Sequence, residues 1–500
     1  MRTSSVLSLA LAALSRALMQ AALAALALNG CGGPPPPPPV ADAGMDLAAP
    51  VDLGPRSTLS DDEAQKARTA CTFTAGAMPG ETLAKDAPIG PQLPIDTVVI
   101  IMMENRSFDH LLGDLPAAGQ KDVEVAPPAA SNPDAKGDPV ARFHLDHFCF
   151  DDTNHEWDGS HRQYDDGKMD GFVVTNQGGL GDPDGRRAMG YQTKDDLPFL
   201  YSLATNFAIA DHYHCSLLGP TFPNREYLYA ATSFGQTENN VFTETKPTLV
   251  RALDAAGVDR HEYFESAPGS GMFGDFHNND VYKIDDPNNP LFADIAEGAL
   301  APVTFIDPNL SDEDGSAHDD DHPPASAQAG DRFLQTILAE LMKGPQWPHM
   351  AIFITWDEHG GLYDHVPPPA ACPPDGLGPV DGKGNPLPGA FDRLGVRVPL
   401  IVVSPYARPH FVSHATYDHT SITRFVEARF LIPALTKRDA NASPLYELFD
   451  FSTPALLAPP ALPDAPLDPA QQAYCQATFP FPRPDGGGAP DGGAPDGGAH

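Results

Sequence analysis

The sequence predicts an α/β fold, a mostly parallel sheet with helices on both faces. Two observations support this prediction. Apolar, β-branched runs of strand length alternate along the chain with segments of helical period, and such alternation is typical of parallel sheets covered by helices. In addition, two of the apolar runs stop abruptly in acidic and polar side chains, as strands do where they deliver residues to a site at the edge of a sheet.

The individual elements follow from these patterns. Runs rich in Val, Ile and Phe predict strands at 97–103, 207–210, 303–306, 351–355 and 398–404. Apolar residues spaced three and four apart predict helices at 196–206, 224–233, 247–256, 328–343 and 419–430. The period is clearest at 328–343, where one side of the helix carries Phe333, Ile337, Leu338, Leu341 and Met342.

Two of the predicted strands end in groups that bind metal ions. One is followed by Glu104 and Asn105, the other by Asp357 and Glu358. Ligands of open α/β sheets bind just outside the carboxyl ends of strands, so we expect the two segments to form one shared cation site. Taken alone, Asn105 could be a helix cap and Glu358 a surface carboxylate.

The neighbouring carboxylates impose a condition on the second strand. Adjacent residues of a strand point to opposite faces, so Asp357 and Glu358 can share a site only if the strand ends before them. Gly360 and Gly361 follow closely, and glycines favour such an early end.

The start of the chain has the layout of an export signal. Arginines precede an apolar stretch at 17–28, and Leu28-Asn29-Gly30-Cys31 follows. We interpret residues 1–30 as a signal peptide. The ending resembles a bacterial lipobox, which implies that Cys31 is lipidated and holds the protein at a membrane, on the outer membrane or cell surface. The alternative is an ordinary signal peptide cut near Cys31, which leaves the protein periplasmic or secreted. Either way we expect export.

Composition divides the rest of the chain. Residues 31–90 begin with a run of prolines at 34–39 and are expected to form a tether and N-terminal segment. Residues 91–451 are long enough for a catalytic domain with a substantial core. Residues 452–500 are expected to be a low-complexity tail, and the Pro-Asp-Gly-Gly repeats of 484–500 to be disordered.

The charge balance excludes one class of partner. The chain has 31 basic and 67 acidic residues, a formal net charge of -36. Nucleic acids need basic patches, so we expect no nucleic-acid partner. An anionic substrate would be repelled unless bound divalent cations reverse the local sign. Alternatively, the acidity only keeps an exported protein soluble.

The cysteines fit an oxidising compartment. Setting Cys31 aside leaves five, Cys71, Cys149, Cys215, Cys372 and Cys475. They allow at most two disulfides and one free thiol, and their wide spacing excludes a CxxC metal site. The pairing cannot be read from the sequence.

Four motifs now carry a resemblance. They read VVIIMMENRSFDH at 98–110, GPTFPNR at 219–225, DHPP at 321–324 and WDEHGG at 356–361. In this order they resemble the bacterial phosphoesterase family, which contains non-haemolytic phospholipases C and acid phosphatase A type enzymes and belongs to the alkaline phosphatase superfamily. The resemblance covers about residues 95–450. It implies an alkaline-phosphatase-like fold and hydrolysis of phosphoric esters.

Thr221 is the expected nucleophile. It lies in a Gly-Pro turn before Pro223, and a hydroxyl held there becomes reactive if a metal ion stabilises its alkoxide. The alternative is that Thr221 only caps the helix expected to begin near Asn224. The segment also fits a sulfatase pattern except at its first residue. A Thr cannot be oxidised to the sulfatase aldehyde, which favours phosphoryl over sulfuryl transfer.

The resemblance also implies a divalent metal ion. Glu104, Asn105, Asp357 and Glu358 match the family's metal-binding positions, with Thr221 as a further ligand. Oxygen ligands suit Ca, Mg or Mn, and nearby imidazoles would make Zn or Fe suitable as well.

The remaining candidates assist at this site. His155 and His322 resemble family positions that contact the phosphoryl group or protonate the leaving group, although a loop His near acidic residues is often only solvated. His359 is expected to orient a metal ligand. Arg225 is expected either to support a ligand or to contact substrate.

The sequence thus predicts an exported, metal-dependent phosphoesterase. The motifs favour phospholipase C-like cleavage of phospholipid head groups through a phosphothreonine intermediate. Acid phosphatase or general phosphodiesterase activity on a small phosphoester remains an alternative, because few residues follow the catalytic domain. A non-catalytic surface lipoprotein on the same fold is the alternative from another class.

Overall fold

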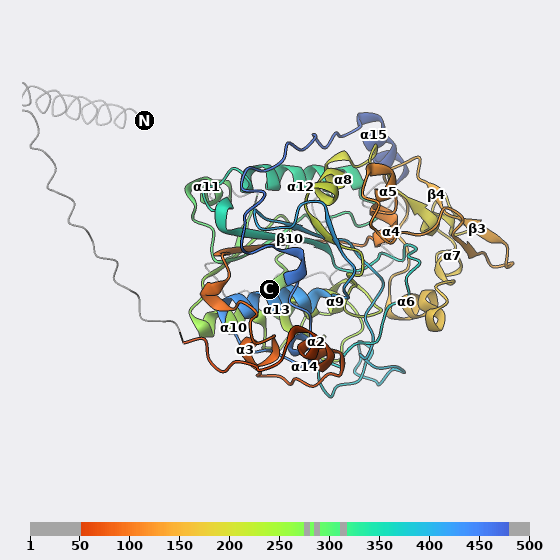
Figure 1. Cartoon of the computed structure of the whole chain (residues 1–500). Coiled ribbons are helices and arrows are strands. Elements are labelled where there is room, and N and C mark those ends of the chain that lie inside the picture. Colours follow the sequence, from red (N-terminus) through yellow and green to blue (C-terminus); the bar gives the residue numbers. More distant parts are fainter. Residues whose placement is uncertain (1–51, 275–280, 285–290, 311–317, 480–500) are drawn as a thin grey trace, which may run out of the picture. The chain divides into compact units, whose positions relative to one another are not determined.

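The computed structural model describes residues 52–274, 281–284, 291–310 and 318–479 (Figure 1). From Leu53 onward the chain belongs to one compact unit. The predicted signal peptide, Cys31, the proline run and the repeats at 484–500 lie outside the described residues. Among the residues that the structure describes, no helix combines the length and apolar character needed to cross a membrane.

A large mixed sheet forms the centre of the unit. Its strand order is β12 (Phe411–Ser413), β6 (Ala208–Ala210), β11 (Leu400–Val403), β10 (Met350–Trp356), β1 (Thr97–Met103), β9 (Val303–Asp307), β7 (Arg260–Phe264) and β8 (Val281–Lys283). Only β11 runs antiparallel to its neighbours in this described sheet. β1 and β10 are buried along their whole length, as expected for strands covered on both faces.

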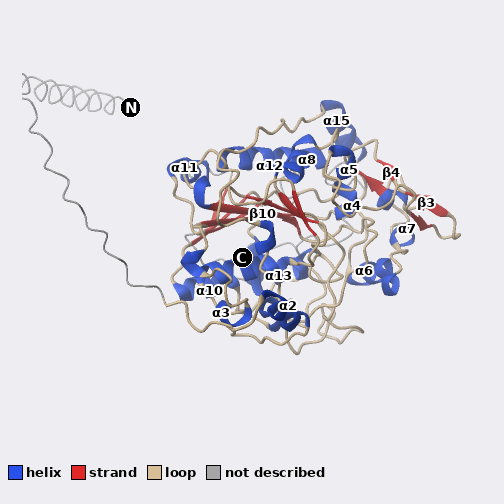
Figure 2. Ribbon diagram, in the orientation of Figure 1, coloured by secondary structure: helices blue, strands red, loops and turns tan. Residues whose placement is uncertain are grey.

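Helices cover both faces of the sheet (Figure 2). One layer contains α8 (Pro198–Asn206), α11 (Leu291–Glu297) and α12 (Ala327–Leu341); the other contains α9 (Thr221–Ala230), α10 (Leu249–Ala256) and α13 (His419–Phe430). The predicted α/β class with a mostly parallel sheet is therefore confirmed.

Further helices and strands lie outside these layers and the central sheet. They are α2 (Asp61–Thr69), α3 (Pro79–Thr82), α4 (Phe108–Leu111), α5 (Leu115–Ala118), α6 (Trp157–Tyr164), α7 (Phe172–Thr175), α14 (Lys437–Ala440), α15 (Pro469–Thr478), β2 (Ser131–Pro133), β3 (Pro139–Ala141), β4 (Phe143–His144) and β5 (Gly190–Tyr191).

Every predicted strand and helix is present, with ends shifted by a few residues. The sequence analysis missed β7, β8 and β12. The residues of β7 read as polar, yet Arg260 and Glu262 are buried. Tertiary contacts hold Glu262 there, because its Oε1 accepts hydrogen bonds from Tyr229 at 3.1 Å and Ser270 at 2.8 Å. Hydrophobic pattern cannot detect such a strand.

Two disulfides connect segments on either side of the expected domain boundaries. Cys71 pairs with Cys372 and Cys149 with Cys475, while Cys215 is a buried free thiol. The first bond ties the expected tether segment to the domain, just after α2. Cys475 of the second disulfide lies in α15, which attaches this part of the expected low-complexity tail to the domain. The predicted limit of two disulfides and one thiol is met.

Candidate active site

The two strands predicted to share a site are direct neighbours in the sheet. In the register of β1 and β10, Met103 pairs with Trp356, so both strands end side by side. The next residues join them, because Asn105 donates its backbone N–H to Asp357 Oδ1 at 3.0 Å. β10 ends at Trp356, which meets the condition for Asp357 and Glu358 to reach one site.

Arg225 binds the ends of three strands together. Its guanidinium lies 3.3 Å from Glu104 Oε1, 3.3 Å from Asp307 Oδ1 and 3.4 Å from Asp357 Oδ2. It also donates to the carbonyls of Met102 and Met103 at 3.1 and 3.3 Å. Because Arg225 is only 1 % exposed, its position favours the expectation that it supports ligands rather than contacts substrate.

Thr221 is the first residue of α9, which begins earlier than predicted. The N-cap is Pro220, and among the described residues no side chain caps this helix. The alternative role of Thr221 as a helix cap was therefore wrong. Residues four apart share one face of a helix, so Thr221 faces the same way as Arg225, one turn before it. Thr221 therefore starts on the helix face that carries Arg225, and its role as nucleophile stays a prediction.

The carboxylates at this site crowd one another. Burial raises the pKa of Glu104 to about 7, and the neighbouring Asp357 carboxylate adds to the rise. Burial also raises the pKa of Glu358 well above its ordinary value. Such shifts reflect the cost of burying ionised carboxylates beside one another. A divalent cation bound there would favour the ionised forms.

Two orphaned atoms test whether a metal ion would fit. Within the described residues, Asn105 Oδ1 and Glu358 Oε1 are buried and have no hydrogen-bond partner. Buried polar atoms are rarely left unsatisfied without a reason such as an ion. Both atoms are oxygens of predicted ligands, and oxygen is the donor that hard divalent cations prefer. The residues present therefore fit a metal ion.

Two histidines stand beside these ligands. The rings of His155 and His322 pack edge to face, with centroids 5.5 Å apart. His155 contacts Asn105, whose Nδ2 lies 3.3 Å from Nε2 of the ring. With Asp152, a residue the sequence analysis missed, the two histidines form a candidate metal-binding group whose ligand atoms lie within 4.8 Å of one another.

The two histidines differ in surroundings. Burial alone lowers the pKa of His155, but the carboxylates of Glu358 and Asp152 outweigh it and raise the pKa to about 10. His322 is partly exposed, and its Nδ1 is 2.7 Å from the carbonyl oxygen of Pro323, which leaves Nε2 for another partner.

His359 lies beside the predicted ligand Glu358, and its role in orienting that ligand stays a prediction. Its Nδ1 is 3.2 Å from Glu358 Oε2, without hydrogen-bond geometry, and its Nε2 is 2.6 Å from Gln163 Oε1. Burial lowers the pKa of His359 to about 3, and the charge of His155 adds to this effect.

A second ionic group lies outside the predicted set. Asp109, Asp364 and His365 form another candidate metal-binding group, but Arg397 already occupies it, 2.8 Å from Asp364 Oδ1 and 3.3 Å from Asp109 Oδ1. His365 Nδ1 lies 2.6 Å from Asp109 Oδ2. An internal cation makes this group a structural ion-pair network.

Comparison of the sequence with known proteins assigns the chain to a family. Residues 95–433 match the sequence model of the Phosphoesterase family. Non-specific phospholipase C1 of Arabidopsis thaliana is 32% identical over 406 residues, 75% of this chain and 75% of that protein. Phospholipase C A of Mycobacterium tuberculosis is 30% identical over 419 residues, 72% of this chain and 78% of that protein.

A solved structure is also similar. A protein in the alkaline phosphatase superfamily from Vibrio parahaemolyticus overlaps 77% of this chain and 78% of its own, with a TM-score of 0.36 and 9% identity.

The assignment to a family rests on the sequence matches, which cover most of the predicted catalytic domain and confirm the resemblance carried by the motifs. The chain belongs to the Phosphoesterase family, a family of hydrolases that act on phosphoric ester bonds.

Proposed function

We propose that this protein is an exported, metal-dependent phosphodiesterase of the phospholipase C type that works through a phosphothreonine intermediate. One observation carries the proposal. Thr221 begins the helix whose Arg225, one turn later, holds Glu104 and Asp357. In this proposal the Thr221 hydroxyl faces the cluster of buried oxygen ligands, which the shared helix face of Thr221 and Arg225 supports. The relatives named phospholipases C favour a phospholipid as substrate.

The residues of the chain have distinct tasks in this mechanism. A divalent cation held by Glu104, Asn105, Asp357 and Glu358 would stabilise a Thr221 alkoxide and the charge on the phosphoryl oxygens. Thr221 Oγ attacks phosphorus, and the bond to the leaving oxygen breaks.

We assign His155 to contact with the phosphoryl group and His322 to proton transfer. His155, buried beside Asn105, is suited to contact a phosphoryl oxygen. His322, partly exposed with Nδ1 tied to a carbonyl, is suited to protonate the leaving oxygen. The same imidazole then accepts a proton from the water that releases the phosphate product.

An assay of three substrates tests the proposed function. Purified protein is given phosphatidylcholine, a soluble phosphodiester and a phosphomonoester under identical conditions. We expect hydrolysis of both diesters to exceed that of the monoester. Preference for the monoester would instead support acid phosphatase activity. Failure to hydrolyse any of the three would support a non-catalytic lipoprotein on the same fold.

The membrane anchor is a separate part of the proposal. It rests on the apolar stretch and on Leu28-Asn29-Gly30-Cys31. Several acyl chains anchor a protein stably, whereas one chain gives only marginal binding. In a bacterial host, Cys31→Ser should move the protein from the membrane fraction to the soluble fraction, measured by immunoblotting of both. A distribution identical to that of the parent would contradict lipidation.

A further inference from the structure

The ion pairs of Arg397 join the two loops that carry the predicted metal ligands. One loop, residues 104–110, follows β1 and contains Asp109; the other, residues 357–365, follows β10 and contains Asp364. Arg397 lies before β11 and contacts both carboxylates. We call these three residues, Arg397, Asp109 and Asp364, the Arg397 clasp.

One guanidinium holds both carboxylates of the clasp. Arg397 Nε donates to Asp364 Oδ1 at 2.8 Å and Nη2 donates to Asp364 Oδ2 at 3.1 Å, which is the bidentate geometry typical of an Arg and a carboxylate. Nη2 also lies 3.3 Å from Asp109 Oδ1. Because all three side chains are buried, salt screens these ion pairs far less than it screens surface pairs.

The guanidinium is fixed from other directions as well. Its Nη1 donates to the carbonyls of Asp211 at 2.7 Å and Glu124 at 3.0 Å, and the group lies over the Phe108 ring, 4.8 Å from the ring centre. Phe108 also donates its backbone N–H to the Arg397 carbonyl at 3.1 Å. The position of Arg397 against the first loop therefore depends on several contacts besides the ion pairs.

The two carboxylates also bond to the backbone of the opposite loop. Asp364 Oδ2 accepts a hydrogen bond from the N–H of Asp109 at 3.2 Å, and Asp109 Oδ2 accepts one from the N–H of His365 at 2.9 Å. The Ser107 hydroxyl adds a further link by donating to the Tyr363 carbonyl at 2.8 Å. The two loops are thus cross-linked at the ends that lie farthest from β1 and β10.

Between the predicted ligands and the clasp, the second loop contains two glycines. Gly360 and Gly361 have φ values of 63° and 65°, in the left-handed region that glycine adopts at low cost. A side chain at Gly360 would collide with the Asn105 carbonyl, so the two loops approach closely there. Because glycines restrain the chain little, the path from Glu358 to Asp364 depends on the contacts that hold it, and the clasp lies at its end.

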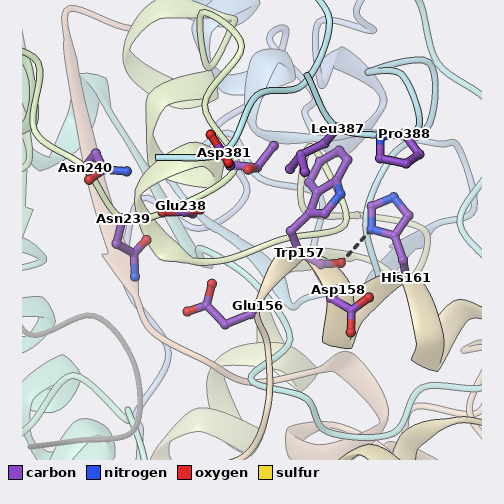
Figure 3. A pocket seen from close by; sticks show the side chains of 11 residues that line it. Glu156, Trp157, Asp158, His161, Glu238, Asn239, Asn240, Asp381, Leu387 and Pro388 are labelled. Carbon is purple, nitrogen blue, oxygen red and sulfur yellow. Dashed lines mark hydrogen bonds between the residues drawn. The ribbon is translucent and has the colours of Figure 1, made fainter. Parts of the chain in front are cut away.

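The clasp is out of reach of substrate. Asp109 is 3 % exposed, and Arg397 and Asp364 are 0 % exposed. The pocket in Figure 3, with a volume of about 710 Å³, is lined by other residues, among them Trp157 and Glu238. Any effect of the clasp on the reaction must therefore pass through the loops that it holds.

We infer that Arg397, Asp109 and Asp364 are positioning residues that hold the two ligand loops in the arrangement that binds the divalent cation. The inference rests on the proposed function and adds to its ligand set the residues that support that set from a distance. Residues that orient metal ligands typically alter metal affinity when they are replaced. The clasp is therefore expected to set the affinity for metal as well as the stability of the fold.

Two conservative variants open the clasp. Asp364→Asn keeps the size of the side chain and removes its charge, whereas Arg397→Lys keeps the charge and loses the fork that binds a carboxylate through two hydrogen bonds. Each protein is dialysed against graded concentrations of a chelator, and the metal that stays bound is measured by elemental analysis. We expect half of the metal to be lost at a chelator concentration about 10-fold lower than for the parent, the lower end of the range for residues that support ligands.

Glu427→Gln is the matched control for general destabilisation. Glu427 Oε2 lies 3.0 Å from Arg424 Nη1 in another fully buried ion pair, within α13. Breaking this pair should lower the melting temperature, as in the clasp variants, but should leave metal retention at the parental value. Equal metal loss in the control would overturn the inference. Clasp variants that retain metal like the parent would also overturn it, while leaving the proposed function intact.

Hydrogen–deuterium exchange of metal-free protein gives a readout that does not depend on bound metal. Peptides covering 104–110 and 357–365 should exchange faster in the clasp variants than in the parent, with exchange in α12 unchanged. A parent that holds no metal as purified would refute the proposed function, yet faster exchange in these two loops would still support the clasp. Parental exchange in both loops would overturn the inference whatever the metal content. One folded variant of the two is sufficient for either measurement.

Discussion

Thr221→Val is expected to lower phosphodiester turnover by roughly a thousandfold or more, because it deletes the attacking oxygen and closes the covalent route. Valine has the shape of threonine, and Thr221 is 6 % exposed and makes no capping hydrogen bond. The free energy of unfolding should therefore change by less than about 1 kcal/mol. Turnover and melting temperature measured on the same preparation separate loss of chemistry from loss of fold.

Thr221→Ser is the matched control for this variant. It keeps the hydroxyl and should retain a measurable part of the parental turnover. A Thr221→Val protein that hydrolyses the diester at near parental rate would end the assignment of Thr221 as nucleophile.

Asp357→Asn is expected to remove most of the bound metal and most of the activity. The amide can still accept the hydrogen bonds that Asp357 Oδ1 receives from the backbone of Asn105 and Glu358, so local structure should persist. Loss of a ligand should weaken metal binding by more than the roughly 10- to 100-fold that loss of a supporting group costs. Elemental analysis of protein purified without added metal measures the content directly.

Asp307→Asn is the matched control for the metal prediction. It removes a carboxylate from the same Arg225 guanidinium but is not a predicted ligand, so its metal content should remain near the parental value. Equal metal in the parent and Asp357→Asn would refute the proposed ligand set. If the parent holds metal and Asp357→Asn does not, chelation of the parent followed by separate addition of Ca, Mg, Mn, Zn or Fe identifies the ion that restores activity.

Strands could be predicted from the sequence where an apolar, β-branched run is followed directly by carboxylates. The strands that became β1 and β10 were recognised because they are apolar and β-branched, and their ends were recognised because carboxylates follow directly. The convergence of Glu104 and Asp357 could be predicted since neighbouring parallel strands end at one edge of a sheet. The same rule applied to β9 would have found Asp307 as well.

Other features depend on contacts that no local pattern contains. The bonds of Arg225 to Glu104, Asp307 and Asp357 require the order of three strands. β7 was missed because its buried polar residue Glu262 is held by tertiary partners that no local pattern shows. The segment at 452–479 reads as a tail, yet the Cys149–Cys475 disulfide attaches α15 to the domain. Disulfide pairing cannot be deduced from cysteine positions alone.

The stereochemical course at phosphorus tests the central claim, a covalent intermediate on Thr221, most directly. A single enantiomer of a phosphorothioate diester is hydrolysed by the intact protein in ¹⁸O-labelled water, and the configuration of the chiral monoester is determined. Each in-line displacement inverts phosphorus, so attack by Thr221 followed by attack by water predicts net retention. Net inversion would show that water attacks directly and would contradict the phosphothreonine mechanism.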